Sequence, residues 1–246
     1  MSARVNPLRA RKAVLFDLDG TLIDYGRDID DVWPRVFAST GATGFSRPQI
    51  DAAFNAVFKP IWRDEIRQRA ERVNMRRAWI HIMGEAFRTL GVKVESEQLP
   101  ALAEEFAAGY IGSTQCCPGA QEMLSLLRAR GLKVGLITNG DSYVQRGKLA
   151  NCGLAEMFDV VQIESECGVG KPDPQAYRLV LESLGCRAHH AVMVGDNWEY
   201  DVLSPMRLGI DAVWISPNGG MRADANPRPL ATIRSLAELL EAISVA

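Results

Sequence analysis

The sequence predicts an α/β fold in which helices cover both faces of a parallel β-sheet, with an all-helical domain inserted after the first strand. From residue 115 onward, short apolar runs alternate with helical patterns, as in a doubly wound sheet. One further apolar run precedes residue 24, and residues 25–114 are helical in period with no strand pattern. We therefore expect an α/β core of residues 1–24 and 115–246 and a helical domain of residues 25–114.

The first strand is expected in the run AVLFD, residues 13–17, because a nearly all-apolar run is typical of a strand buried on both faces. This run leads directly into the acidic pair Asp17 and Asp19, followed by Gly20 and Thr21. Buried carboxylates are costly unless they are paired, protonated or bound to a cation. The pattern therefore predicts that some partner meets Asp17 and Asp19 at the end of the strand.

The inserted domain follows the two aspartates at once, at a loop where insertions are well tolerated. Its helical patterns cover 28–40, 48–73, 76–91 and 96–112. This position in the chain predicts a lid over the acidic pair.

Two groups of side chains in the lid could serve a substrate. Arg69, Arg72 and Arg76 share one face of a helix and could attract an anion, although a solvated face with acidic partners is the commoner role. Trp33, Trp62 and Trp79 could stack on a base or a sugar, but core packing is the default for tryptophan.

The remaining core elements alternate regularly. Strands are expected at 132–140, 158–164, 190–196 and 211–216, and helices at 118–131, 141–154, 173–185 and 235–243. Asp141 or Ser142 would cap the second of these helices, and Asp173 with Pro174 would start the third. Strands separated by helices of this length indicate a parallel sheet.

Polar side chains follow the ends of the first four expected strands. Beyond the first-strand acids these are Thr138 and Asn139, then Lys171 in the loop GVGKPDP, and finally Asp196 with Asp201 five residues further on. Each motif alone is weak, since a lone lysine or aspartate is usually a solvated loop or helix-start residue. Their order is informative, because ligands of open parallel sheets bind beyond the carboxyl ends of the strands.

These residue types suit phosphoryl transfer. Mg²⁺ would relieve the repulsion among the carboxylates and binds alongside a phosphate. Asp17 could then attack phosphorus as a nucleophile, while Thr138 and Lys171 neutralise the phosphoryl oxygens. Asp19 would act as the general acid and base, which requires surroundings that hold it protonated above its ordinary pKa near ~3.9.

The motifs DLDGT, TNG, GKPDP and GDNWEYD resemble, in that order, the four motifs of the haloacid dehalogenase-like hydrolase superfamily. The resemblance implies a Rossmann-like core with a C1-type helical cap. It also implies that Asp17 is the nucleophile and Asp19 the acid/base. Thr138, Asn139 and Lys171 would bind phosphate. Asp17 and Asp196 with the main-chain carbonyl of Asp19 would bind Mg²⁺, supported by Asp201.

The resemblance also helps to sort the reactions of the superfamily. Its dehalogenases lack an aspartate at the position of Asp19, so Asp19 favours a phosphatase that acts on a small phosphorylated metabolite, a nucleotide or a sugar phosphate. A phosphomutase keeps both aspartates and is the main alternative. A 2-haloacid dehalogenase and a non-catalytic binding protein are the remaining ones.

The stretches TNGDSYVQRGKLANCGL and VGDNWEYDV are similar to a branch of the superfamily that contains pyrimidine nucleotidases and N-acylneuraminate phosphatases. This chain has Ser204-Pro205 where that branch often has Gly-Ala. Because proline disrupts a helix interior, we expect the helix after Asp201 either to begin with Ser204 as its cap or to be kinked.

Composition excludes several function classes. The 246 residues are 47 % apolar with a formal net charge of −2, which argues against a nucleic-acid polymer or a membrane surface as partner. The start of the chain has no apolar signal-peptide core, and the five cysteines suit reduced thiols in the cytoplasm. The three histidines form no metal-binding pattern. We expect a cytoplasmic monomer or homodimer.

Overall fold

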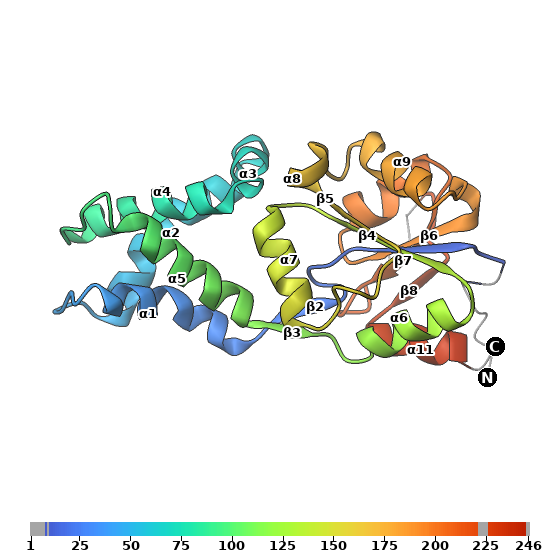
Figure 1. The fold of residues 1–246 in the computed structure, drawn as a ribbon, viewed down its shortest axis with the longest axis horizontal. Helices are drawn as coiled ribbons and strands as arrows, with labels where there is room; N and C mark the ends of the chain where they lie inside the picture. The colour runs from blue at the N-terminus through green and yellow to red at the C-terminus, as the bar shows by residue number, and fades with distance from the viewer. Residues whose placement is uncertain (1–7, 9, 221–225, 245–246) are drawn as a thin grey trace. The chain divides into compact units, whose positions relative to one another are not determined.

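The computed structural model describes residues 8, 10–220 and 226–244, so the start of the chain, where no signal peptide is expected, lies outside the described residues. The chain divides into two compact units (Figure 1). The α/β unit holds the residues up to Asp24, then Gln115–Asn139, and those from Cys152 onward. The helical unit holds Tyr25–Thr114 and Gly140–Asn151.

The α/β unit is built on a six-stranded sheet in the order β5-β4-β1-β6-β7-β8, in which every neighbouring pair is parallel. Its strands are β1 (Ala13–Phe16), β4 (Lys133–Thr138), β5 (Val160–Ile163), β6 (Ala191–Gly195), β7 (Asp211–Ile215) and β8 (Ala231–Ile233). The strand order reverses at β1, the position at which open parallel sheets bind ligands. All four residues of β1 are buried, as its apolar run predicts.

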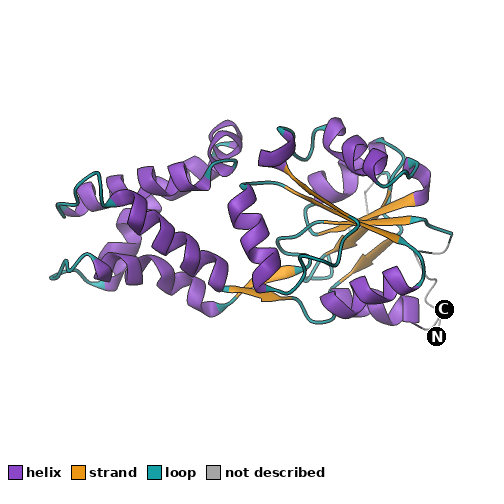
Figure 2. Cartoon of the chain, in the orientation of Figure 1, coloured by secondary structure: helices purple, strands orange, loops and turns teal. Residues whose placement is uncertain are grey.

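Helices cover both faces of this sheet (Figure 2), which confirms the predicted fold class. The longer ones are α6 (Ala120–Ala129), α9 (Pro174–Ser183) and α11 (Leu236–Ser244), and shorter segments are α8 (Glu164–Cys167), η2 (Ala188–His190) and α10 (Ser204–Arg207). Apolar side chains of α9, among them Tyr177 and Val180, pack against Leu15 of β1 in one buried cluster. Asp173 caps α9 as predicted, accepting a hydrogen bond from Gln175 N at 2.8 Å.

The helical unit contains η1 (Arg27–Asp31), α1 (Val32–Ser39), α2 (Arg47–Arg63), α3 (Glu65–Arg72), α4 (Met75–Leu90), α5 (Leu99–Gly112) and α7 (Ser142–Asn151). Its core includes Trp33 and Trp79, which are 5 % and 2 % exposed and pack as tryptophan does by default. Two of the four chain crossings between the units lie in β2 (Ile23–Tyr25) and β3 (Thr114–Cys116), which pair as a two-stranded sheet.

Helix α7 was expected in the α/β core, but it groups with the helical unit. Val144 of α7 belongs to the core cluster of that unit, and Gly147 packs tightly against Ile111 of α5. Asn151 at the end of α7 donates hydrogen bonds to the carbonyl and the hydroxyl of Thr114. Local periodicity shows that a segment is helical, but it does not show which unit its apolar side packs against.

The segment 48–73 forms two helices instead of the single helix expected from its period. Asp64 has extended backbone dihedrals between α2 and α3, and its carboxylate caps α3 by accepting from Ile66 N and Arg67 N. A further break at Asn74 separates α3 from α4. The predicted face shared by Arg69, Arg72 and Arg76 is therefore interrupted, and Arg76 instead pairs with Glu104 of α5 at 2.6 Å.

The helix around Asp201 begins earlier than Ser204. It starts at η3 (Trp198–Leu203), a wide π-helical segment capped by Asn197, whose side chain accepts from Tyr200 N at 3.0 Å. Ser204 has helical dihedrals and continues the chain into α10. Pro205 thus follows a change of helix type and lies in the first turn of α10, where a residue without an N–H group is tolerated.

Strand β8, the cysteines and the apolar length of the helices complete the description of the fold. The strand β8 was missed, because its three residues follow a turn-rich stretch that shows no strand pattern. None of the five cysteines forms a disulfide bond. Among the described residues, no helix is long and apolar enough to cross a membrane.

Candidate active site

The predicted polar residues of the strand ends meet at the switch point of the sheet. Phe16 of β1 pairs with Leu136 of β4 on one side and with Val194 of β6 on the other. Asp17, the next residue after β1, therefore lies between the end of β4 and the end of β6. Thr138 ends β4 and Asp196 follows β6 directly, so parallel pairing carries these residues to one edge.

A buried ion cluster forms the centre of this edge. The ammonium of Lys171 donates to Asp17 Oδ1 at 2.6 Å and to Asp201 Oδ1 at 2.7 Å. Lys171 is 2 % exposed, Asp17 8 % and Asp201 0 %. Lys171 is thus the partner that the buried Asp17 requires, and two carboxylates face this one ammonium.

The charges of the cluster shift one another's pKa values. Burial disfavours the ammonium of Lys171, but the attraction of Asp17 and Asp201 outweighs burial and raises its pKa, so the lysine stays charged. For Asp17, burial outweighs the attraction of Lys171, and the neighbouring acids Asp201 and Asp19 add repulsion; together they raise its pKa to about 7. The cluster therefore carries more negative charge than its own lysine neutralises.

Asp196 completes the acidic edge. Asp196 as a whole is exposed, but its carboxyl group is partly desolvated. This desolvation is the larger cause, and repulsion from Asp17 the next, of a pKa raised to about 6. Carboxylate oxygens of Asp17, Asp196 and Asp201 lie within 4.8 Å of one another. Oxygen donors at this spacing with surplus negative charge fit a hard divalent cation such as Mg²⁺.

Asp201 uses both of its oxygens within the protein. Oδ1 accepts from Lys171 Nζ, and Oδ2 accepts from Asn197 N at 3.0 Å. It therefore holds the lysine and the loop after β6 in place. Gly195 permits this packing, because a Cβ at residue 195 would overlap the Asp201 carboxyl group.

Asp19 lies two residues beyond Asp17 and is partly exposed. Its charge contributes to the raised pKa of both Asp17 and Asp196, so its carboxyl group belongs to the same cluster. Gly20 follows with φ of 78°, and a Cβ there would lie 2.6 Å from Asp196 Oδ2. Glycine at residue 20 thus lets the turn after β1 approach Asp196 closely.

Thr138 is buried at the end of β4, and its hydroxyl contacts the Asn139 carbonyl at 3.4 Å. The Asn139 side chain is committed to the Lys171 loop: its Nδ2 donates to the Lys171 carbonyl and its Oδ1 accepts from Lys171 N, both at 2.7 Å. A phosphate contact from Asn139 would therefore come from its main-chain N–H. These two hydrogen bonds, which we call the Asn139 clamp, fix the backbone from which the Lys171 side chain reaches Asp17.

Several supporting residues escaped the sequence reasoning. Asn197 caps η3 and its N–H orients Asp201, and the indole of Trp214 in β7 donates to the Asp196 carbonyl at 2.9 Å. Asparagine just before a helical run is a cap signal that could have been used. Trp214 carried no such signal, because its contact depends on how β7 pairs with β6.

Comparison with known proteins agrees with this arrangement. A family model described as haloacid dehalogenase-like hydrolase matches residues 11–209, a span that includes every residue of the ion cluster. The chain belongs to the haloacid dehalogenase-like hydrolase family. The resemblance carried by the four motifs is thereby confirmed.

Individual relatives within this family differ in how much of the chain they match. A phosphoserine phosphatase of Thermus thermophilus is 39 % identical over 124 residues. This match covers 49 % of this chain and 50 % of that protein, so it spans only half the length of the relative. The pyrimidine 5'-nucleotidase YjjG of Escherichia coli is 28 % identical over 92 % of this chain and 95 % of its own. A 2-haloacid dehalogenase structure from Pseudomonas syringae pv. Tomato DC3000 shares 27 % identity with a TM-score of 0.68, over 96 % of this chain and 99 % of that one.

Proposed function

We propose that this member of the family is a Mg²⁺-dependent phosphatase that hydrolyses a small phosphate monoester. The observation that carries the proposal is the Asp17 carboxylate held 2.6 Å from the Lys171 ammonium, with Asp19 two residues further on in the same cluster. A nucleophile, a cation for the phosphoryl oxygens and a second carboxyl group for proton transfer are thus available at one edge.

Asp17 would attack through Oδ2. Lys171 holds Oδ1, whereas Oδ2 has only a long contact of 3.5 Å from the Thr21 hydroxyl among the described residues. As the bond from Oδ2 to phosphorus forms, the bond from phosphorus to the ester oxygen breaks, and Asp19 gives its proton to that oxygen. The product of this step is the free alcohol and a phosphorylated Asp17.

The second step would release phosphate. Asp19, now ionised, takes a proton from a water molecule, and the water oxygen attacks the phosphorus of the aspartyl-phosphate. The bond between phosphorus and Asp17 Oδ2 breaks, and inorganic phosphate leaves. Lys171 and Thr138, together with the main-chain N–H groups of their loops, would hold the phosphoryl oxygens in both steps.

Asp17, Asp196 and the main-chain carbonyl of Asp19 would hold Mg²⁺. When bound, the ion supplies positive charge that keeps Asp17 ionised and neutralises the phosphoryl group. Asp201 would support this site through Lys171 and Asn197, as its two engaged oxygens suggest.

We further propose a nucleotide or sugar phosphate as substrate and the helical unit, including α7, as the lid of the site. The relative named as a pyrimidine 5'-nucleotidase, which matches nearly the whole chain, supports the nucleotide. Asp19 favours a phosphatase over a dehalogenase, because a halide leaving group needs no proton. The five cysteines, none of which forms a disulfide bond, are consistent with our proposal of a reducing compartment, the cytoplasm.

The test is Asp17→Asn. We expect the variant to lose phosphate release from p-nitrophenyl phosphate and from a panel of nucleotides and sugar phosphates, by about 10³-fold or more, as for removal of a nucleophile. Its thermal unfolding should stay close to that of the unchanged protein, and EDTA should abolish the activity of the latter. Turnover retained in Asp17→Asn would contradict the mechanism, and phosphate moved within a sugar without release would indicate a mutase.

A further inference from the structure

The helical unit contains a cavity whose lining includes none of the residues proposed for the phosphatase site. Its volume is about 450 Å³, and all of its lining residues belong to this unit. Cavities that bind small molecules have volumes of about 300–1,000 Å³. The size alone therefore permits an organic ligand, and the lining decides which kind.

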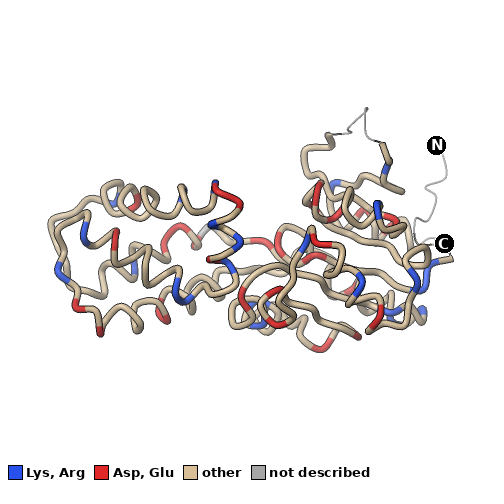
Figure 3. Tube along the Cα trace, turned by 90° about the horizontal axis from the view of Figure 1, so that it is seen from above, with Lys and Arg blue, Asp and Glu red and all other residues tan. Residues whose placement is uncertain are grey.

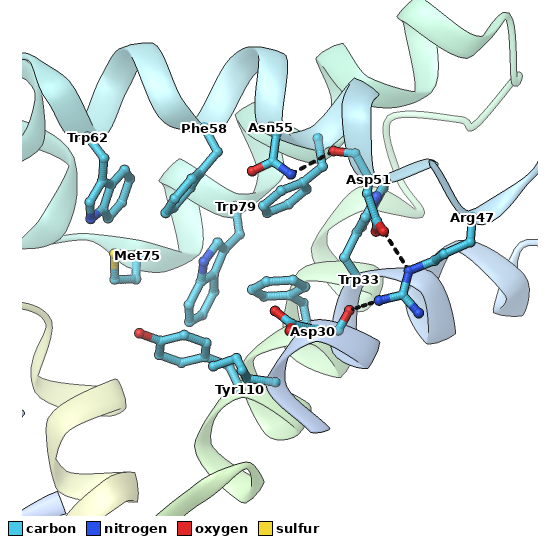
Figure 4. Close-up of a pocket in the computed structure, with 13 residues that line it drawn as sticks. Asp30, Trp33, Arg47, Asp51, Asn55, Phe58, Trp62, Met75, Trp79 and Tyr110 are labelled. Atoms are coloured by element: carbon cyan, nitrogen blue, oxygen red, sulfur yellow. Dashed lines mark hydrogen bonds and ion pairs between the residues drawn. The ribbon is translucent and has the colours of Figure 1, made fainter. Parts of the chain in front are cut away.

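Two aromatic walls enclose the cavity (Figure 4). Phe54, Phe58 and Trp62 project from α2 at intervals of four residues; Phe58 stacks on Phe54 at 5.7 Å and on Trp62 at 4.5 Å between ring centroids. The opposite wall consists of Trp79 of α4 with Phe106 and Tyr110 of α5, which contact one another. A cavity with aromatic side chains on both sides favours a planar aromatic ligand, which can contact these rings by stacked or edge-to-face packing.

The walls converge at one end and stay apart at the other. Phe54 stacks on Phe106 at 5.6 Å, which closes the inner end. Toward the other end, Figure 4 shows Phe58 and Trp62 on one side and Trp79, Met75 and Tyr110 on the other. Tyr110 is fixed there by a 2.6 Å hydrogen bond between its hydroxyl and that of Tyr25. Rings near the open end, such as Trp62, are only half-buried, so a ligand would cover apolar surface that the fold leaves exposed.

The polar rim disfavours an anion. Asp30 and Asp51 line the cavity together with Arg47, and Arg47 already pairs with Asp51 at 2.6 Å and with Asp31 at 2.7 Å. Arg47 also donates to the Asp30 carbonyl at 2.5 Å, so the guanidinium among the lining residues is already paired, and two carboxylates line the cavity beside it. The phosphorylated end of a metabolite would be repelled here, whereas an uncharged ring would not.

One rim group offers a hydrogen bond. Asn55 Nδ2 donates to the Asp51 carbonyl at 2.9 Å, and within the part of the chain that the structure describes, its Oδ1 has no protein partner. This oxygen can accept from a hydroxyl or a ring N–H group of a ligand. The basic and acidic residues of the helical unit are otherwise interspersed along its trace (Figure 3).

We propose that this cavity, lined by Phe54, Phe58, Trp62, Trp79, Phe106 and Tyr110, binds an uncharged planar aromatic compound that carries a hydrogen-bond donor. The site is contained in the helical unit, and its occupation does not require the chemistry of Asp17.

The test is calorimetric titration of the full-length Asp17→Asn protein with 2-naphthalenemethanol. We expect one site per chain. The fully saturated analogue and the methyl ether, which lacks the donor, should each bind about threefold to tenfold more weakly, and the anionic 2-naphthoate about tenfold or more. Because the Asp17→Asn protein is expected to release no phosphate, binding is measured without catalysis, and the result is independent of whether the proposed phosphatase activity exists.

Two cavity variants locate the site. Trp62→Ala removes part of one wall, and Phe58→Trp fills the cavity with a larger ring; each should weaken binding about tenfold or more. The matched control is Tyr143→Ala, an aromatic residue of the same unit that is 58 % exposed and lies outside the cavity; it should bind as before. Phe58→Trp should unfold no earlier than the parent, so its effect cannot come from misfolding.

Three results would overturn the proposal: no heat of binding at millimolar probe, binding unchanged in both cavity variants, or equal affinity for the aromatic and the saturated ring.

Discussion

Lys171 is the residue on which the buried charges of the site depend. It is the cation within hydrogen-bond distance of both Asp17 and Asp201, and all three side chains are withdrawn from water. Removing one partner of a buried ion pair is costly, because the remaining charge keeps its desolvation penalty without compensation. At Lys171 two such charges would remain.

We therefore expect Lys171→Ala to lower the free energy of unfolding by roughly 3–5 kcal/mol at pH 8 in urea denaturation. The loss should shrink at pH 5, where the Asp17 carboxyl group, whose pKa is already raised to about 7 beside the lysine, is protonated. Lys133→Ala at the exposed start of β4 is the control and should change stability by about 0.5 kcal/mol or less. Equal losses in the two variants would contradict this account.

At the scale of elements, the loop from β6 into η3 connects the acids of the site to the sheet. Asp196 follows β6, Asn197 caps η3, and Asp201 lies inside η3 with its Oδ2 bonded to Asn197 N. Trp214 of the neighbouring strand holds the Asp196 carbonyl. The position of the exposed Asp196 thus depends on the start of a helix and on the pairing of two strands.

Asn197→Ala should lower the free energy of unfolding by about 1 kcal/mol, as expected for a lost helix cap. Asn74→Ala is the matched control, because Asn74 caps α4 in the helical unit by accepting from Arg77 N at 3.1 Å. Both variants should lose similar stability in urea. Only Asn197→Ala should raise the Mg²⁺ concentration needed for half-maximal activity, by about tenfold. The same Mg²⁺ requirement in both would show that the cap does not position the acids.

At the scale of the whole molecule, the acidic edge makes stability depend on pH and on metal. The pKa values of Asp17 and Asp196 in the folded protein are raised to about 7 and about 6 from 3.8. A raised carboxyl pKa means that the folded state binds the proton more tightly than the unfolded state. The resulting stabilisation is complete below the unfolded value near pH 4 and is lost as the pH rises through 6 to 7.

Mg²⁺ should reverse this loss, since it binds the ionised carboxylates of the folded protein and protons compete with it. We expect the rise in melting temperature on adding MgCl₂ to be largest at pH 8 and to vanish toward pH 5, in differential scanning fluorimetry. Asp196→Asn should remove the effect at every pH. A Mg²⁺-induced shift that is independent of pH would be inconsistent with a site made of these acids.

Much of the site could be predicted from the chain because parallel strands end at one edge. Once β1, β4 and β6 were located by their apolar runs, Asp17, Thr138 and Asp196 were expected at one edge of the sheet, and the pairing of β1 with both β4 and β6 makes them neighbours. The details that depend on a second segment could not be predicted. The Asn139 clamp on the Lys171 backbone and the contact of Trp214 with Asp196 each join residues that no local pattern relates.

The sequence by itself determined five of the six strands of the main sheet, most of the helices and the acidic strand ends, because apolar periodicity and caps act over a few residues. Tertiary structure alone decided that α7 groups with the helical unit and that aromatic residues of α2, α4 and α5 enclose a cavity. The physical reason is that burial and close packing depend on which surfaces meet, and those surfaces come from segments far apart in the chain.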